Sequence, residues 1–222
     1  MSSTLPIVET FHSLQAEGLH FGKSAFFIRL AGCKVGCPWC DTKESWPIEN
    51  HPKQSISKLS KEVVKAQSLG ASMVVITGGE PLHHNLNSLC NAILESTKNQ
   101  NHKVLPIHLE TSGVDDMSGT INWITLSPKR HAPPRSSILS SCDELKVVIT
   151  KEDDLIFAEH MAEEAIKKRK ASSLKGVKII KPYLFLQPAW ENKEGKNLSI
   201  EYIKRHPQWR LSLQMHKWLG IL

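Results

Sequence analysis

Short apolar runs of strand type alternate with longer amphipathic runs along most of this chain, and this alternation constrains its fold most. Strands are predicted at Ala25–Leu30, Met73–Thr77, Leu105–Glu110, Trp123–Leu126, Leu145–Ile149, Tyr183–Leu186 and Arg210–Leu213. Apolar residues at helical spacing predict helices over Ile56–Leu69, Leu86–Ser96, Asp153–Lys170 and Leu198–Arg205. Strands that alternate with helices form βαβ units, so the pattern indicates one mostly parallel sheet.

The length of the chain limits how far such a sheet can close. A complete eight-unit α/β barrel usually takes about 250 residues, whereas this chain has 222. We therefore expect an α/β fold that forms a partial, open barrel of about six parallel strands with reduced helices. Residues 1–222 are predicted to form a single domain, because one hydrophobic core suffices for this length. Active sites of such folds lie at the C-terminal ends of the strands.

The composition is that of an ordinary globular protein, with 40% hydrophobic and 23% charged residues. No apolar run is long enough to span a membrane and no secretion signal is visible, so we expect a cytoplasmic protein. The formal net charge is +6, and much of it lies in Lys167, Lys168, Arg169, Lys170, Lys175 and Lys178. Because no nucleic-acid-binding motif accompanies this run, we expect a solvated helix end and loop, with no nucleic-acid partner.

Three of the five cysteines, Cys33, Cys37 and Cys40, follow the first predicted strand with CxxxCxxC spacing. Such a loop can wrap its thiolates around an iron–sulfur cube. Ordinary 4Fe–4S electron carriers use four cysteines, so three ligands leave one iron open to a small molecule. The alternative is a zinc site completed by a distant Cys or His, although no second CxxC or HxxxH pair occurs. Cys90 and Cys142 are expected to be buried structural residues.

The cysteine spacing, with Trp39 before the last cysteine, resembles the signature of the radical S-adenosylmethionine superfamily. The resemblance implies that Cys33, Cys37 and Cys40 hold a 4Fe–4S cluster. In this superfamily the amino and carboxylate groups of S-adenosylmethionine chelate the open iron. An electron from the cluster then splits a carbon–sulfur bond, and the resulting 5′-deoxyadenosyl radical abstracts hydrogen from the substrate. Because the radical comes from the cofactor, no protein side chain is predicted to be catalytic.

Further motifs at the predicted strand ends resemble the cofactor-binding elements of the superfamily. TGGEP at 77–81 resembles the element whose main chain receives the methionine amino group, although alone it could be an ordinary turn. ETSG at 110–113 would supply a carboxylate for the ribose hydroxyls, and SPK at 127–129 and QP at 187–188 follow later strands. The implied cofactor-binding residues are Gly79, Glu80, Glu110, Ser112, Ser127, Pro128, Lys129, Gln187 and Pro188.

Motifs along nearly the whole chain resemble one family within that superfamily, the 7-carboxy-7-deazaguanine synthases. The family typically shows FS(L/I)QGEG, F(I/V)RLxGC, CDT, TGGEP, ETSG, SPK, LQP and a closing QxHK element. This chain has FHSLQAEG at 11–18, FFIRLAGC at 26–33, CDT at 40–42 and LQMHK at 213–217. The resemblance implies a lyase that contracts the ring of 6-carboxy-5,6,7,8-tetrahydropterin to 7-carboxy-7-deazaguanine. Ammonia is lost, and the product enters queuosine and other 7-deazapurine biosynthesis.

The resemblance also implies substrate-binding residues, namely Leu14, Gln15, Ala16, Glu17, Arg29, Thr77 and Leu222. Gln15 and Glu17 suit the N–H groups and carbonyls of a pterin edge, and Arg29 suits the substrate carboxylate through a bidentate fork. Thr42 is implied as a ligand of Mg²⁺, an ion that keeps several waters and substrate oxygens. The alternatives are a surface ion pair for Arg29, ordinary loop groups for Gln15 and Glu17, and a helix cap for Thr42.

Two positions depart from the family pattern, since Ala16 replaces the usual Gly and Leu222 stands where many relatives end in Pro. The resemblance further implies a homodimer and a flavodoxin or ferredoxin as reductant. A glycyl-radical enzyme activase is the rival function, because it shares the CxxxCxxC element. An activase would not require Gln15, Glu17 or Arg29.

Overall fold

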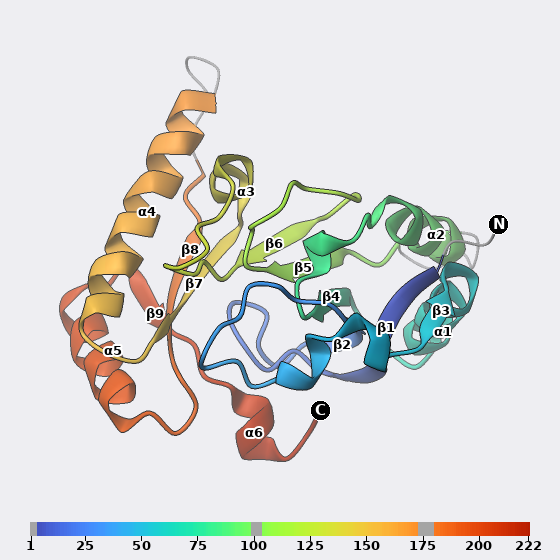
Figure 1. Cartoon of the computed structure of the whole chain (residues 1–222), viewed down its shortest axis with the longest axis horizontal. Coiled ribbons are helices and arrows are strands. Elements are labelled where there is room, and N and C mark those ends of the chain that lie inside the picture. The colour runs from blue at the N-terminus through green and yellow to red at the C-terminus, as the bar shows by residue number, and fades with distance from the viewer. Residues whose placement is uncertain (1–3, 99–103, 173–179) are drawn as a thin grey trace.

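The fold is taken from a computed structural model, which describes residues 4–98, 104–172 and 180–222. Its centre is a nine-stranded sheet with the strand order β3-β1-β2-β4-β5-β6-β7-β8-β9 (Figure 1). β1 pairs antiparallel with β2 and β3, whereas the run from β2 through β4 to β9 is parallel. The strands are β1 (Thr4–Leu14), β2 (Ser24–Leu30), β3 (Lys53–Ser55), β4 (Val74–Gly78), β5 (Ile107–Thr111), β6 (Trp123–Leu126), β7 (Glu144–Ile149), β8 (Tyr183–Pro188) and β9 (Trp209–Leu211).

Helices α1 to α5 pack on the outer face of the curved sheet and are unevenly distributed along it (Figure 1). The helices are α1 (Ile56–Ser68), α2 (Asn87–Lys98), α3 (Ser136–Ser141), α4 (Asp153–Ser172), α5 (Lys193–Arg205), α6 (Met215–Leu219) and the 3-10 helices η1 (Lys43–Ser45), η2 (Ile48–Asn50) and η3 (Pro81–His83). The connection between β5 and β6, which is described throughout, contains no helix. The partial open barrel of parallel strands with reduced helices is therefore confirmed.

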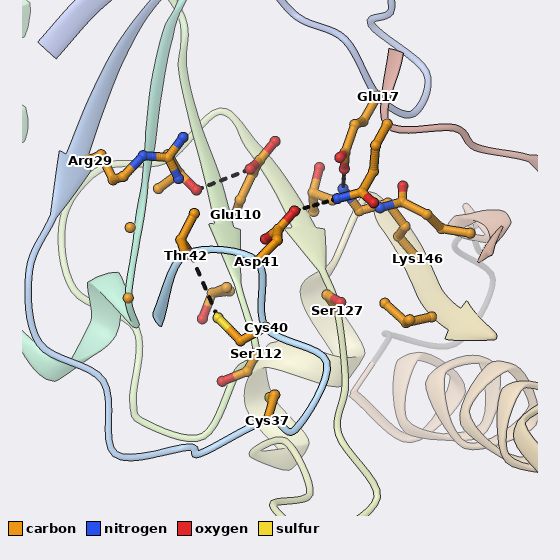
Figure 2. A pocket seen from close by; sticks show the side chains of 18 of the residues that line it. Glu17, Arg29, Cys37, Cys40, Asp41, Thr42, Glu110, Ser112, Ser127 and Lys146 are labelled. Carbon is orange, nitrogen blue, oxygen red and sulfur yellow. Dashed lines mark hydrogen bonds and ion pairs between the residues drawn. The ribbon is translucent and has the colours of Figure 1, made fainter. Parts of the chain in front are cut away.

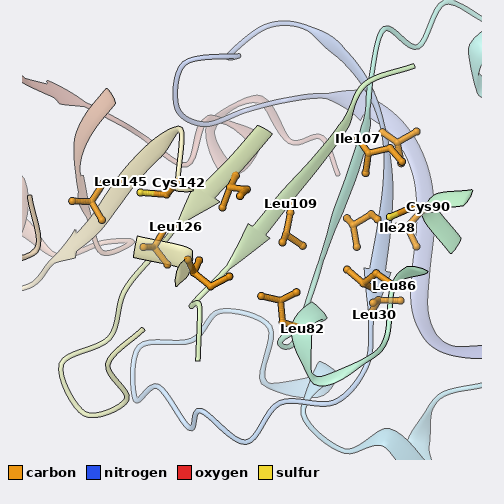
Figure 3. Close-up of a cluster of buried hydrophobic side chains, with 14 of the residues drawn as sticks. Ile28, Leu30, Leu82, Leu86, Cys90, Ile107, Leu109, Leu126, Cys142 and Leu145 are labelled. Carbon is orange, nitrogen blue, oxygen red and sulfur yellow. The ribbon is translucent and has the colours of Figure 1, made fainter. Parts of the chain in front are cut away.

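Side chains along the parallel strands alternate between two environments. Ile28 and Leu109 belong to the main core between the sheet and the helices (Figure 3), and so does Ile76. Their neighbours Phe27 and Val75 belong to a small inner cluster on the other face of the sheet. Further along the strands the inward positions become polar and line one cavity, with Arg29, Thr77, Glu110, Lys146 and Gln187. The strand period of two thus separates the core from the chemistry.

The main core also accounts for the two isolated cysteines. Cys90 on α2 and Cys142 before β7 are completely buried there (Figure 3), which confirms the prediction of structural residues. Burial raises the pKa of Cys90 to about 11 and that of Cys142 to about 12. Both side chains are therefore protonated thiols at neutral pH.

Every predicted strand and helix is present, but two strands, two α-helices and the three 3-10 helices were not predicted. β1 has a register shift between Ile7 and Glu9, and this irregularity breaks the alternation by which strands are recognised. β3, α3 and α6 are short. The predicted helix from Leu198 instead begins at Lys193, because the side chain of Asn192 caps it by accepting a 2.6 Å hydrogen bond from Gly195 N.

The basic run falls in the last turns of α4, as predicted for its first part. Lys167 is exposed there and pairs with Glu164 at 3.0 Å. Lys175 and Lys178 lie outside the described residues. Within the described residues, none of the helices combines the length and apolar character that crossing a bilayer requires.

Candidate active site

A cavity of about 280 Å³ lies at the C-terminal ends of the parallel strands. Its walls come from the strand ends, the cysteine loop, the loop after β1 and the C-terminal segment. Figure 2 shows side chains from these separate elements turned toward a common space. All the site residues predicted from sequence line the cavity except Pro128, which is buried beside Ser127.

The cysteine loop follows β2 and is folded back onto η1 by its own main chain. Gly32 N donates to Ser45 O at 2.7 Å, and Cys33 N donates to Trp46 O at 3.2 Å. Gly36 has a φ of +70°, a left-handed conformation that glycine adopts at little cost. Cys37 is buried and Cys33 and Cys40 are partly exposed, and all three thiols are free of disulfides. One short loop thus turns three thiols to one cavity.

The surroundings of the loop fit an iron–sulfur cluster held by three cysteines. The β4 turn lies directly behind the loop, since Gly79 N donates to Leu30 O and Glu80 N to Gly32 O, both at 2.9 Å. A Cβ on Gly79 would stand 2.5 Å from Gly32 O, so only glycine permits this approach. Burial raises the pKa of Cys33 and Cys37, and a bound metal centre would reverse this by stabilising the thiolates.

Glu80 joins the ends of β4 and β5 through a carboxylate that is 1% exposed. Its oxygens accept hydrogen bonds from Thr111 Oγ1 at 2.5 Å, Ser112 N at 2.8 Å and Leu82 N at 3.0 Å. The Ser112 hydroxyl also donates to this carboxylate. The side chains of Glu80 and Ser112 are thus hydrogen-bonded to each other and join the two strand ends.

Glu110 lies in a second hydrogen-bonded group, with residues predicted to bind substrate. It accepts from Gln15 Nε2 at 3.0 Å and from Thr77 Oγ1 at 3.1 Å. Burial alone would raise the pKa of Glu110, but Lys146 and the hydrogen bonds from Gln15 and Thr77 hold it below its usual value. Its proximity to Gln15 and Thr77 sets it apart from Glu80, and its predicted contact with the ribose stays a prediction.

Arg29 extends from β2 toward the cavity and forms an ion pair on the way. Its Nε donates to Glu9 Oε1 at 2.8 Å, and its guanidinium lies 5.9 Å from the centre of the Phe11 ring. The side chain is 20% exposed, so this pair is partly buried at the cavity wall. Among the described residues, the two terminal nitrogens of Arg29 have no hydrogen-bond partner. Of the three guanidinium nitrogens of Arg29, only Nε therefore forms an ion pair, as the alternative interpretation proposed.

Thr42 stands at the N-terminus of η1, yet its side chain makes no capping hydrogen bond. The hydroxyl lies 3.7 Å from Cys40 Sγ and lines the cavity (Figure 2). The helix-cap alternative therefore does not account for the hydroxyl. Oxygen next to the cysteine loop is the kind of ligand that Mg²⁺ takes when most of its other positions hold water.

Lys146 on β7 was not anticipated from the sequence. It is 6% exposed, lines the cavity and forms an ion pair with Glu17 (Figure 2). A signal was present, because a lysine within the apolar run ELKVVI is out of place in a buried strand unless it is paired. The contact itself could not be foreseen, since its partner lies 129 residues away.

The C-terminal segment forms another wall, where the sequence implied Leu222 but not the contacts that hold the segment in place. Asp41, next to the last cysteine, accepts hydrogen bonds from Gln214 Nε2 at 2.6 Å and Lys217 Nζ at 2.8 Å. Met215 N donates to Ala16 O at 3.2 Å. Ala16 has no positive φ, so an alanine is unstrained where the family pattern has glycine. Leu222 closes the segment, and a main-chain oxygen of Leu222 accepts from Ser13 Oγ at 2.7 Å.

Comparison with known proteins identifies the class to which this fold and site belong. Residues 27–125, from β2 into β6, match the family model for the Radical SAM superfamily. The matched segment contains the cysteine loop, the TGGEP turn and the ETSG strand end. This match places the cysteine loop and the strand ends beside it in the radical S-adenosylmethionine class, and the cavity they line is its candidate active site.

Similar proteins narrow this class to one family. A 7-carboxy-7-deazaguanine synthase from Prochlorococcus marinus is 65% identical over the whole of both chains. One from Synechocystis is 46% identical over all of this chain and 95% of the relative. The crystal structure of QueE from Escherichia coli superposes with a TM-score of 0.70 at 32% identity, covering 95% of this chain and 93% of that one. The chain belongs to the 7-carboxy-7-deazaguanine synthase family.

Family membership confirms the resemblance that the motifs indicated and implies the 4Fe–4S cluster and S-adenosylmethionine as cofactors. It decides against both alternatives, the zinc-stabilised module and the glycyl-radical activase. For zinc, Cys90 and Cys142 are enclosed in the main core.

Proposed function

We propose that the cavity binds 6-carboxy-5,6,7,8-tetrahydropterin beside cluster-bound S-adenosylmethionine and contracts the pterin ring to 7-carboxy-7-deazaguanine, releasing ammonia. One observation carries this proposal: the Arg29 guanidinium, the Glu17 carboxylate and the three-cysteine loop all line the same cavity. A cation, an acceptor and a cluster site in one space suit an anionic heterocycle with N–H donors. The product would serve the synthesis of queuosine or another 7-deazapurine.

The cofactor side of the cavity is assigned to the cysteine loop and the strand ends. Cys33, Cys37 and Cys40 would hold the cluster, which with S-adenosylmethionine supplies a hydrogen-abstracting radical when bound. Lys129 offers a hydrogen-bond donor held in place, since its Nζ donates to Ser127 O at 2.9 Å and to Ser127 Oγ at 2.7 Å. The residues proposed to bind S-adenosylmethionine are Gly79, Glu80, Glu110, Ser112, Ser127, Pro128, Lys129, Gln187 and Pro188.

The substrate side is assigned to the loop after β1 and to β2. Arg29 would hold the pterin carboxylate with its two terminal nitrogens, because Glu9 fixes the third and thereby the plane of the fork. Thr42 would hold Mg²⁺ through its hydroxyl, and the ion would orient and polarise the same carboxylate. The residues proposed to line the pterin are Leu14, Gln15, Ala16, Glu17, Arg29, Thr77 and Leu222.

The family pattern supports three further parts of the proposal. The enzyme would be a homodimer built from single-domain chains of residues 1–222. It would work in the cytoplasm, and a flavodoxin or ferredoxin would reduce the cluster. Size measurement in solution would test the homodimer, and reduction of the cluster by each purified carrier would test the reductant.

The decisive experiment replaces Arg29 in the anaerobically reconstituted protein, supplied with pterin, S-adenosylmethionine, Mg²⁺ and a reductant. The parent protein should release ammonia and form a deazaguanine chromophore. Arg29→Ala should weaken pterin binding about 10- to 100-fold, the effect of losing a charged hydrogen-bonded pair. Iron content and reductive cleavage of S-adenosylmethionine should stay unchanged.

Arg205→Ala, which removes an exposed arginine on α5, is the matched control and should behave like the parent. An Arg29→Ala protein that binds the pterin normally but loses its cluster would disprove the role given to Arg29. A parent protein that cleaves S-adenosylmethionine without consuming the pterin would disprove the proposed substrate.

A further inference from the structure

We propose that Lys146 is a positioning residue that orients Glu17 as an ionised acceptor for the N–H edge of the pterin. Through Glu17 it would set the preference of the site for 2-amino pterins over their 2-oxo analogues. The inference rests on the proposed function, because it assumes that a pterin occupies the cavity. None of the family motifs includes Lys146, and its assignment comes from its contacts alone.

The position of Lys146 is unusual for a lysine. Its neighbours on β7, Leu145 and Val147, point into the main core, so Lys146 points to the other face of the sheet, where the cavity lies. With 6% exposure its ammonium has lost most of its water. A buried ammonium is costly unless it is paired, and Lys146 Nζ pairs with Glu17 Oε2.

The loop that carries Glu17 is fastened on both sides of this residue. Gln15 reaches Glu110 before it, and after it Gly18 N donates to Ser212 Oγ at 3.1 Å and Leu19 N to Glu144 Oε2 at 3.0 Å. These bonds hold the main chain, and Lys146 holds the side chain. The pair uses only Oε2, and Oε1 of Glu17 has no partner among the described residues. Glu17 thus keeps one acceptor for a ligand in the cavity it lines.

The charges around Lys146 keep it a cation. Burial lowers the pKa of Lys146, but the carboxylates of Glu17, Glu110 and Glu144 outweigh burial and raise it above the ordinary value. Lys146 is therefore neither a proton donor nor a base at neutral pH. Conversely, its charge opposes the burial that raises the pKa of Glu110 and Glu144. The other cations lining the cavity, Arg29 and Lys129, come from β2 and the β6 end.

The selectivity follows from the chemistry of the two kinds of ligand. A 2-amino pterin presents two adjacent N–H donors, from its amino group and the neighbouring ring nitrogen, which an ionised carboxylate can accept. A 2-oxo analogue replaces one donor by a carbonyl oxygen, which a carboxylate repels. A site built around an oriented acceptor rejects such an analogue strongly, because its own polar groups are left without partners.

The test uses the reconstituted full chain and three variants, Lys146→Met, Lys146→Arg and Glu17→Gln. Lys146→Met keeps the length of the side chain without its charge and should weaken pterin affinity about 10- to 100-fold. Iron content should not change. Lys146→Arg should recover most of the loss. Lys204→Met, which removes the cation of an exposed 3.0 Å pair with Glu201, is the matched control.

A double-mutant cycle decides whether Lys146 acts through Glu17. If it does, Lys146→Met should add little to the pterin-binding defect of Glu17→Gln, because both changes remove the same interaction. Glu17→Gln should also lose the preference for the 2-amino pterin over its 2-oxo analogue. The ligand preference of Glu17→Gln can be measured even if Lys146→Met does not fold.

Three results would overturn the inference, namely additive effects in the cycle, normal pterin affinity in Lys146→Met, and undiminished preference in Glu17→Gln. Loss of iron in Lys146→Met would make the residue a general support of the site and would equally refute the specific role. A parent protein that does not bind the pterin would refute the proposed function itself. Failure of that function is therefore visible before any variant is compared.

Discussion

At the scale of single residues, Gly79 and Glu80 explain why the TGGEP turn must have its sequence. Gly79 lets the β4 turn touch the main chain of the cysteine loop, and Glu80 ties the same turn to β5. Neither residue needs to offer a reactive side chain. Both fix the distance between two loops that would share one cofactor.

Replacement of Gly79 by Ala should displace the cysteine loop, because the new Cβ would lie 2.5 Å from Gly32 O and 2.9 Å from Cys33 Cβ. We expect a loss of about 1–3 kcal/mol in unfolding free energy and reduced iron content after anaerobic reconstitution. Gly22→Ala is the control, since Gly22 has a φ of +81° but no atom within 4 Å of a new Cβ. It should retain iron, and a Gly79→Ala protein with full iron content would contradict the steric argument.

At the scale of elements, α6 is a short helix that closes a wall of the cavity although little of it is buried. The ion pair between Lys217 and Asp41, at 2.8 Å, holds α6 against the cysteine loop. Lys217 Nζ also lies 5.0 Å from the centre of the Trp190 ring. No residue of α6 is buried, so its local stability depends on such surface contacts, which include the edge contact of Trp218 with Trp190 at 5.7 Å.

Lys217→Met should therefore loosen α6 without affecting the sheet. Loss of a partly exposed ion pair is worth about 0.5–1 kcal/mol, which corresponds to faster amide exchange by a factor of roughly 2 to 5 in residues 214–222. Hydrogen–deuterium exchange read by mass spectrometry measures this directly. Lys204→Met on α5 should leave these residues unchanged, and equal exchange in both variants would mean that the pair does not seat α6.

At the scale of the whole molecule, a cluster of aromatic side chains lies near the N-terminal ends of β5, β6 and β8, away from the strand ends that line the cavity. The His20 ring lies 4.6 Å from that of His108 and 4.5 Å from that of Trp123, centre to centre. Tyr183 lies beside Trp123, and Arg210 covers it at 5.1 Å. Burial, with His20 as a lesser cause, lowers the pKa of His108 from 6.5 to about 4.

This burial predicts a pH dependence of stability. Between pH 6.5 and 4 the unfolded chain binds a proton at His108 that the folded chain does not, so stability should fall as the pH falls through that window. The shift corresponds to at most about 3 kcal/mol. Urea unfolding of the metal-free protein at pH 7 and pH 4.5 should show a smaller difference for His108→Gln than for the parent. The control His160→Gln, at an exposed position, should match the parent. If the stability difference between the two pH values is the same in all three proteins, His108 is not its cause.

The sequence could predict those parts of the molecule that depend only on residues close together in the chain. The strand period and the motifs at strand ends identified the parallel run and the residues of the cysteine loop, because each lies within a few neighbouring positions. Lys146 with Glu17 and Lys217 with Asp41 escaped prediction, because each pair joins distant segments through side chains alone. β1 escaped because its register shift disguises a strand as an irregular segment.

The sheet does not close on itself, since β3 and β9 are its two ends. The segment after β1 instead reaches the segment after β9 through Gly18 with Ser212 and Ala16 with Met215. A closed barrel of strands would have a fixed circumference, and widening it would break all the hydrogen bonds between two neighbouring strands. Here isolated hydrogen bonds join the two ends, so breaking them would leave every pair of strands intact.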